Sequence, residues 1–164
     1  MKYEFPKAEV TATDISGNAL EIATYNARVN HKENAAEIKF LIGDMLQALK
    51  EYDYDVVVSN PPYVTYEEEV MDIVKQHEPQ NAVYAEENGL LCYKKLFLEA
   101  PNYVKKKSLI ALEIGAEQGQ SVSDLAKEAF PESIVRVEQD MQQRDRFVFV
   151  FNGVNPDDKD LEYI

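Results

Sequence analysis

Nine residues near the middle of the chain decide the fold: Asp55-Val56-Val57-Val58-Ser59-Asn60-Pro61-Pro62-Tyr63. The consecutive valines favour a β-strand, and an unbroken apolar run is typical of a strand that is buried on both faces of a parallel sheet. Proline has a fixed φ angle and no backbone N–H, so the strand ends before Pro61. A stiff polar loop therefore follows directly from a buried strand.

Strands and helices alternate on both sides of this stretch. We expect strands at residues 8–13, 37–42, 55–59 and 108–114. We expect helices after Ser16, as their N-cap, and at 88–103 and 121–129, with a long loop of weak helical character at 67–87. The last two strands, 134–138 and 146–151, have no long helix between them and should pair antiparallel. The alternation predicts an α/β fold with a mostly parallel sheet and a final antiparallel strand.

Polar residues follow the ends of several expected strands. They are Asp14, Asp44, Asn60 to Tyr63, and Glu113 to Gly115. In open α/β sheets, ligands bind beyond the carboxyl ends of the strands. We therefore expect these residues to converge on one site.

Charge and composition narrow the class of protein. The 164 residues suit one domain, and 45% of them are hydrophobic, which is enough for a core. The net charge of −13 argues against direct binding to nucleic acid, and the only basic cluster, Lys105-Lys106-Lys107, is expected at a turn. No apolar run approaches the roughly 18 residues of a membrane span. The single cysteine, Cys92, fits a reducing cytoplasm.

The loop at Asn60 offers hydrogen-bond acceptors in a fixed arrangement. Asn60 and Pro61 each precede a proline, which holds both in extended conformations. The Asn60 side-chain oxygen and the Pro61 carbonyl are therefore placed to accept the two hydrogens of a planar NH₂ group, and Tyr63 adds an aromatic face. This arrangement would orient a nitrogen nucleophile toward a methyl donor without acid–base catalysis. The alternative is that Asn-Pro-Pro is only a stiff turn.

The two upstream aspartates have open interpretations. Asp14 either bonds ribose hydroxyls, as acids do at this place in nucleotide-binding folds, or caps the following helix. Asp44 either bonds an adenine amino group or forms a turn after Gly43. His31 and His77 are not near cysteines or carboxylates at metal-ligand spacing, so no metal is expected.

The motifs together resemble the HemK-type (PrmC) release factor glutamine methyltransferases, over residues 8–151. Matching stretches beyond Asn60 to Tyr63 are Thr13-Asp14-Ile15-Ser16, Gly43-Asp44, Glu78-Pro79, Asn88-Gly89-Leu90, Leu112-Glu113-Ile114-Gly115 and Arg144-Asp145-Arg146. Asn88 departs from the family, which usually has aspartate there.

The resemblance implies a class I methyltransferase fold that uses S-adenosylmethionine. It implies cofactor contacts from Asp14, Ile15, Asp44, Met45 and Asn60. Asn60, Pro61 and Tyr63 would be the catalytic residues, and with Pro62 they would hold the substrate. The substrate would be the glutamine of the Gly-Gly-Gln motif in peptide chain release factors, and the product N5-methylglutamine.

One part of the family pattern is not found in this sequence. The family has a first strand and a glycine-rich loop upstream of the strand at Ala8, and this chain has six glycines but no Gly-x-Gly. We expect residues 1–151 to form a partial methyltransferase domain, followed by an acidic tail at 152–164, and we expect weak cofactor binding. The absent strand would lie between those ending at Asp14 and Asn60. Its neighbours would pair directly or with another chain, so exposed sheet edges would favour self-association.

Two other functions remain open from sequence. Adenine N6-methyltransferases of nucleic acids share Asn-Pro-Pro-Tyr, although the negative charge counts against them. The chain could also be a non-catalytic remnant that acts as a binding module.

Overall fold

The computed structural model of the 164-residue chain describes residues 5–31, 38–50, 52–67 and 79–157. The chain folds as two compact units, Met1–Glu51 and Tyr52–Ile164. The predicted Glu78 and His77, most of the acidic tail, and much of the loop at 67–87 lie outside the described residues.

The first unit is a strand–helix–strand arrangement. β1 (Val10–Asp14) and β2 (Ile38–Ile42) pair in parallel, with Asp14 opposite Ile42. Helix α1 (Gly17–His31) connects them, and a short 3₁₀ helix, η2 (Met45–Ala48), follows β2. The Ser16 hydroxyl accepts a hydrogen bond from the Ala19 N–H at 3.2 Å, which confirms Ser16 as the N-cap of α1.

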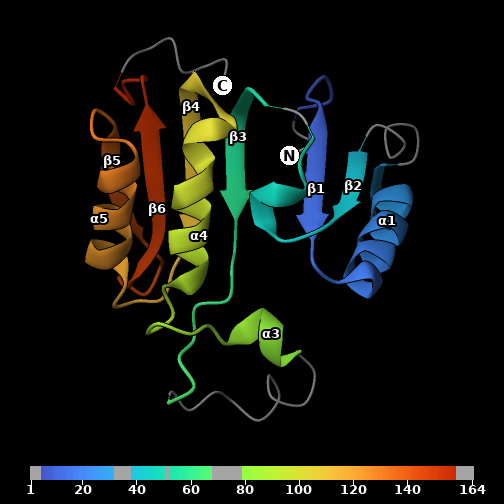
Figure 1. The fold of residues 1–164 in the computed structure, drawn as a ribbon, viewed down its shortest axis with the longest axis horizontal. Helices are drawn as coiled ribbons and strands as arrows, with labels where there is room; N and C mark the ends of the chain where they lie inside the picture. Colours follow the sequence, from blue (N-terminus) through green and yellow to red (C-terminus); the bar gives the residue numbers. More distant parts are fainter. Residues whose placement is uncertain (1–4, 32–37, 51, 68–78, 158–164) are drawn as a thin grey trace. The chain divides into compact units, whose positions relative to one another are not determined.

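The second unit contains a four-stranded sheet in the order β3-β4-β6-β5 (Figure 1). Its strands are β3 (Tyr54–Ser59), β4 (Val104–Glu113), β5 (Ile134–Gln139) and β6 (Asp145–Asn152). β3 and β4 are parallel, whereas β6 is antiparallel to both β4 and β5. The predicted hairpin and final antiparallel strand are therefore confirmed.

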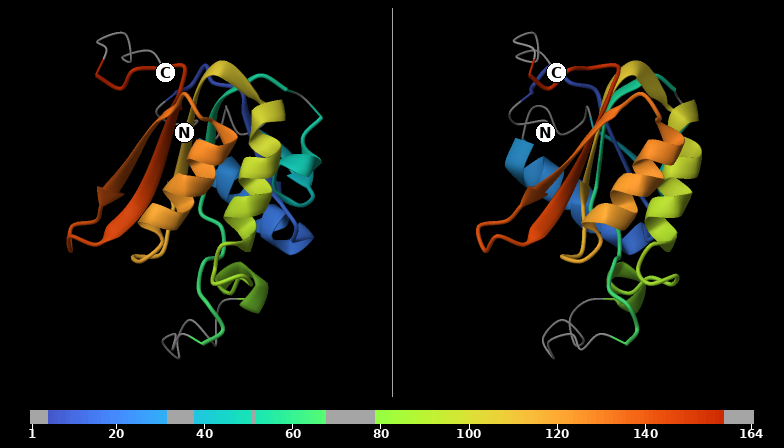
Figure 2. Two further views of the ribbon diagram at one scale, coloured as in Figure 1. Left: turned by 60° about the vertical axis from the view of Figure 1, so that its left-hand side comes forward. Right: turned by 90° about the vertical axis from the view of Figure 1, so that its left-hand side faces the viewer.

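Two helices cover one face of this sheet. Figure 2 shows α4 (Leu91–Glu99) and α5 (Gly119–Ala129) on the same side of the strands. Alternate residues of β4 and β6 point toward these helices and are buried, because side chains alternate between the faces of a strand. Large side chains buried in this core include Tyr93, Leu96, Ile110, Leu112, Ile114, Val122, Val148 and Val150. The other helices in the described part of this unit are short: α3 (Gln80–Val83) and η3 (Ala100–Asn102).

The helix predicted at 88–103 is shorter than expected. Glu87, Asn88 and Gly89 have φ angles of 56°, 57° and 77°, which a right-handed helix does not permit. The helix therefore begins at Leu91, and its continuation past Glu99 is the separate 3₁₀ turn that contains Pro101.

The prediction that Lys105 to Lys107 form a turn was wrong. All three belong to β4. Tyr54 pairs with Val104 but Val56 pairs with Leu109, so β4 carries several extra residues opposite Asp55. This bulge accommodates the charged run, and Lys105 forms an ion pair with Asp55 at 2.7 Å.

The strands that end at Asp14 and Ser59 each have a pairing partner within their own unit. Among the described strands, β1 pairs only with β2, and β3 only with β4. No helix within the described residues is long and apolar enough to cross a membrane.

Candidate active site

The loop Asn60 to Tyr63 leaves the carboxyl end of β3 beside the end of β4. Ser59 pairs with Leu112, so the loop emerges next to Glu113. Pro61 is buried, whereas Asn60 is exposed. No side chain within the described residues hydrogen-bonds the Asn60 amide. The loop thus combines a buried proline with an exposed amide that no described side chain occupies.

The Tyr63 hydroxyl lies between two charged side chains. It donates a hydrogen bond to Glu113 Oε1 at 3.2 Å and accepts one from Arg146 Nη1, also at 3.2 Å. Arg146 Nη1 also donates to the Ile114 carbonyl at 3.1 Å. The predicted convergence of Tyr63 with Glu113 is therefore confirmed within the second unit.

The backbone of Tyr63 is held by a second group. Gln118 donates from Nε2 to the Tyr63 carbonyl at 3.1 Å and to the Asn88 carbonyl at 3.3 Å. Its Oε1 accepts a hydrogen bond from the Gly115 N–H at 2.9 Å. One amide side chain therefore joins the loop after β3, the turn before α4 and the end of β4.

Gly89 packs directly against this loop. A Cβ atom at Gly89 would lie 2.1 Å from the Tyr63 carbonyl oxygen and 2.4 Å from Gln118 Nε2. Its φ angle of 77° also lies in the left-handed region that favours glycine. Only glycine fits this position, for both reasons.

Burial, neighbouring charges and hydrogen bonds shift the pKa of three groups in this region. Burial raises the pKa of the Tyr63 hydroxyl, and the Glu113 carboxylate adds to that effect. Burial likewise raises the pKa of Tyr93, whose hydroxyl donates to the Glu113 carbonyl at 2.8 Å. Hydrogen bonds from the backbone N–H groups of Arg144 and Gln142 lower the pKa of Asp140. Both tyrosines therefore stay protonated at neutral pH and serve as hydrogen-bond donors.

Four of the five predicted cofactor residues, all but Asn60, lie in the first unit. Asp14 ends β1, and its carbonyl accepts a hydrogen bond from the Gly43 N–H at 3.0 Å, so Asp14 and Gly43-Asp44 are neighbours at one edge of the sheet. Asp14 Oδ1 accepts a hydrogen bond from the Ser16 N–H at 2.7 Å. Ile15 is exposed, and Met45 begins η2 with a φ angle of 45°. That all these residues meet Asn60 remains a prediction.

The acidic pair suits an adenosine. Two carboxylates at adjacent strand ends offer acceptors for ribose hydroxyls and an adenine amino group. Asp14 has a turn-forming role through Oδ1, and no interaction within the described residues occupies its Oδ2. The turn and ribose interpretations of Asp14 are therefore compatible.

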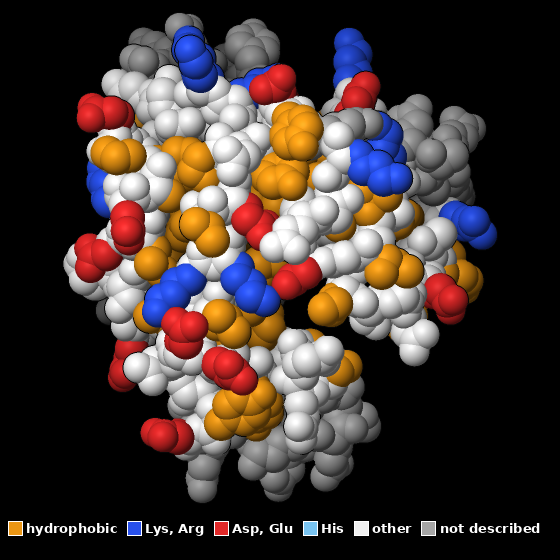
Figure 3. Space-filling model, viewed as in Figure 1, with side chains coloured by type: hydrophobic (Ala, Val, Ile, Leu, Met, Phe, Trp, Pro, Cys, Tyr) orange, Lys and Arg blue, Asp and Glu red, His pale blue; other side chains and the backbone are white. Residues whose placement is uncertain are grey.

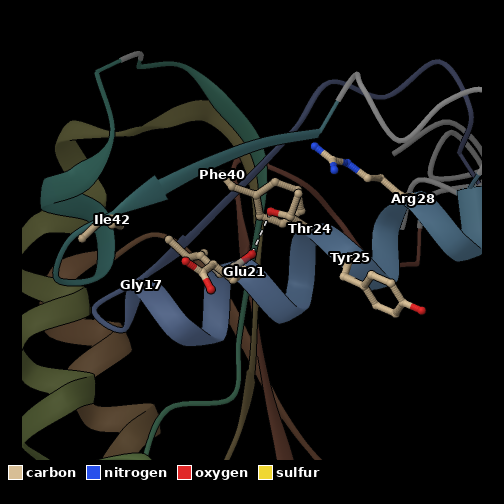
Figure 4. Close-up of a pocket in the computed structure, with 8 residues that line it drawn as sticks. Gly17, Glu21, Thr24, Tyr25, Arg28, Phe40 and Ile42 are labelled. Atoms are coloured by element: carbon tan, nitrogen blue, oxygen red, sulfur yellow. Dashed lines mark hydrogen bonds between the residues drawn. The ribbon is translucent and has the colours of Figure 1, made fainter.

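A separate hollow of about 450 Å³ lies between α1 and β2 (Figure 4). None of the predicted site residues lines it. It is lined by Gly17, Leu20, Glu21, Thr24, Tyr25, Arg28, Phe40 and Ile42. Thr24 points back to its own helix and donates to the Leu20 carbonyl at 2.7 Å. We assign no chemistry to this hollow.

Sequence reasoning missed two residues of this region: Gln118, which bonds the Tyr63 carbonyl, and Tyr93, which bonds the Glu113 carbonyl. Gln118 stands three residues after Gly115 and at the N-cap position of α5, which was the only signal available for it. Tyr93 lies in a mostly apolar helical segment, a pattern that predicts a core residue and gives no sign of a hydrogen bond to Glu113.

Surface charge agrees with the composition. On the face shown in Figure 3, the Lys and Arg side chains of the described residues are scattered among Asp and Glu and form no continuous stripe. Proteins that bind nucleic acid usually present a basic face.

Comparison with known proteins places the chain among methyltransferases. The release factor glutamine methyltransferase of Bacillus anthracis is 40% identical over 144 residues, covering 85% of this chain and 50% of that protein. That of Lactococcus lactis is 37% identical over 143 residues, covering 86% and 51%. The chain thus spans about half the length of the curated relatives it matches.

Solved structures show the same fold. A methyltransferase from Pyrococcus furiosus superposes with a TM-score of 0.60 at 20% identity, covering 94% of this chain and 68% of that one. This likeness confirms the class I methyltransferase fold. The family model described as the methyltransferase small domain matches residues 1–130. The chain therefore belongs to the methyltransferase small domain family.

Proposed function

We propose that this chain carries the methyl-acceptor site of a protein glutamine N5-methyltransferase that acts on peptide chain release factors. The observation that carries the proposal is the Asn60 amide, which is exposed and has no hydrogen-bond partner among the described side chains. It lies on a loop that is held at Tyr63 by Glu113, Gln118 and Arg146. The similarity to release factor glutamine methyltransferases supports the substrate class.

The loop supplies two acceptors for the glutamine amide. The Asn60 Oδ1 and Pro61 carbonyl oxygens would each accept one N–H of the substrate NH₂ group. Holding both hydrogens fixes the plane of the amide and directs its nitrogen toward the donor. Because Pro61 is buried and both prolines have fixed φ angles, the loop loses little conformational entropy when the substrate binds.

S-adenosylmethionine, when bound, supplies the methyl group: the N–CH₃ bond forms as the S–CH₃ bond breaks, and sulfur keeps the electron pair. Asp14 and Asp44 would hold its ribose and adenine, with Ile15 and Met45 beside them. Asn60 and Pro61 would stabilise the positive charge that develops on the amide nitrogen, because both present oxygen dipoles. The proton then passes to water, and no titrating side chain is needed.

A hybrid protein tests this proposal. This chain would replace the matching 144 residues of the Bacillus anthracis relative, which supplies the half that the chain does not span. The hybrid would be incubated with tritiated S-adenosylmethionine and a release factor, the same factor with its Gly-Gly-Gln glutamine changed to alanine, or adenine-containing DNA.

We expect methyl transfer only to the factor that keeps its glutamine. Transfer to DNA would replace the proposal with a nucleic-acid methyltransferase. Capture of the release factor without methyl transfer would indicate a binding module instead.

A further inference from the structure

Arg146 connects three segments around the acceptor loop. Its Nη1 donates to the Tyr63 hydroxyl at 3.2 Å and to the Ile114 carbonyl at 3.1 Å. Its Nε lies 3.6 Å from Asp140 Oδ2, and both side chains are 22% exposed. One guanidinium thus joins the loop after β3, the end of β4 and the turn between β5 and β6.

Glu113 gives the Tyr63 hydroxyl a single orientation. The hydroxyl donates to the Glu113 carboxylate and accepts from the Arg146 guanidinium. A hydroxyl between an acceptor-only group and a donor-only group has one favourable direction for its proton. Hydrogen bonds to charged partners are also stronger than those between neutral groups.

Tyr63 is thereby held at both ends. Its carbonyl is bonded to Gln118 at 3.1 Å, and its hydroxyl is bonded to Glu113 and Arg146. The two preceding residues are prolines, whose φ angles are fixed. A displacement of the Tyr63 ring would therefore be passed along the loop to the Pro61 carbonyl and the Asn60 amide.

We propose that Arg146 and Glu113 are positioning residues for the methyl acceptor, acting through the Tyr63 hydroxyl to fix the Asn60 amide and the Pro61 carbonyl. The proposal rests on the function proposed above. Glu113 and Arg146 both bond the Tyr63 hydroxyl, and neither is bonded to Asn60 or Pro61. Their effect on the Asn60 amide is therefore indirect. A purely structural role would instead stabilise the β5–β6 hairpin and leave Asn60 unchanged.

Four variants of the whole chain separate these roles: Arg146→Gln, Glu113→Gln, Tyr63→Phe and the control Arg144→Gln. Arg144 lies on the same hairpin, is exposed, and has its Nε 3.9 Å from Asp140, but it does not bond Tyr63. Tyr63→Phe keeps the ring and removes only the hydroxyl. It serves as the second test if Arg146→Gln does not fold.

The first measurement is NMR of the chain alone. Arg146→Gln and Tyr63→Phe should shift the Asn60 side-chain amide resonances and lower the backbone order parameters of the loop, whereas Arg144→Gln should change neither. In a ¹³C titration, Glu113→Gln should lower the pKa of Tyr63, because the carboxylate favours the protonated phenol. If Asn60 is unaffected in both Arg146→Gln and Tyr63→Phe, the positioning role is wrong.

The second measurement is binding of a release factor to the same variants. We expect Arg146→Gln and Tyr63→Phe each to weaken binding about tenfold, with no further loss in the double variant and partial recovery in Arg146→Lys. Wild-type binding that does not depend on the substrate glutamine would reject the proposed function, while the NMR result would still decide the positioning role. Glutamine-dependent binding that is equal in wild type and Arg146→Gln would reject positioning alone.

Discussion

The Tyr63 hydroxyl and the Arg146 guanidinium lie 3.2 Å apart although 83 residues separate them in the sequence. This contact joins the loop that follows β3 to β6, the last strand in the sequence. Glu113, Gln118 and Arg146 all hold Tyr63, and they come from different segments of the second unit. The geometry of the loop therefore depends on the correct folding of those segments.

Replacing Gly89 with alanine should displace the acceptor loop. The new Cβ would meet the Tyr63 carbonyl at 2.1 Å, and alanine is strained at a φ angle of 77°. The backbone strain alone should cost about 1–3 kcal/mol of unfolding free energy, measured by urea denaturation. Gly17→Ala is the control, because its Cβ would meet only Ile42 Cδ1 at 3.5 Å. Equal effects of the two variants would contradict the packing described here.

Replacing Gln118 with glutamate should loosen the same loop while keeping the size of the side chain. Glutamate loses the N–H donors that reach the Tyr63 and Asn88 carbonyls, and it places negative charge against both oxygens. Each lost hydrogen bond costs about 0.5–1.5 kcal/mol, partly offset because negative charge is favourable at the start of α5. Thermal denaturation should show a lower melting temperature. An unchanged melting temperature would contradict a stabilising role for the Gln118 hydrogen bonds to Tyr63 and Asn88.

The buried Tyr93 should make the second unit sensitive to alkali. Its folded-state pKa is raised, so this contribution to stability is complete below about pH 10 and declines as the pH rises above the unfolded value. Tyr93→Phe should lose about 1 kcal/mol at pH 7 through the missing bond to the Glu113 carbonyl. It should also show a weaker decline above pH 10. A denaturation series at pH 7 to 11 checks both effects, and parallel curves for the two proteins would contradict them.

Two variants separate the turn and ligand roles of Asp14. Asn keeps an oxygen that accepts the Ser16 N–H, so Asp14→Asn should preserve the start of α1. Ser16→Ala removes the cap itself and should destabilise the first unit by about 1 kcal/mol. Circular dichroism during denaturation compares the two. In the hybrid enzyme, Asp14→Asn should weaken S-adenosylmethionine binding and Ser16→Ala should not. The reverse order would assign Asp14 to structure alone.

The sequence predicted those features that depend on local pattern. The valines at 56–58 and the prolines after them predicted a strand followed by a stiff loop, and β3 ends at Ser59 as this implies. The expectation that this strand is buried on both faces was wrong, because no residue of β3 is buried and Val58 is 60% exposed. Ser16 was recognised as an N-cap because capping depends on residue type and a short-range bond. The antiparallel pairing of the last two strands followed from the absence of a long helix between them.

Long-range contacts were beyond sequence reasoning. Gln118 and Tyr63 are 55 residues apart, and nothing local to either residue indicates their hydrogen bond. The left-handed turn at Glu87 and Asn88 also escaped prediction, because non-glycine residues adopt positive φ only where surrounding structure imposes it. Lys105 to Lys107 looked like a turn because the bulge that accommodates them depends on the neighbouring strand.

The central claim is that Asn60 and Pro61 hold the glutamine amide for methylation. The most direct test compares Asn60→Ala with the control Asn102→Ala, an exposed residue of η3, in the hybrid enzyme. The measurement is the initial rate of methylation of the Gly-Gly-Gln glutamine, located by mass spectrometry of the release factor. The account predicts that Asn60→Ala lowers this rate by about 100-fold or more, as expected for loss of one preorganised hydrogen-bonding group, and that Asn102→Ala leaves it unchanged. A rate in Asn60→Ala equal to that of the control would contradict it.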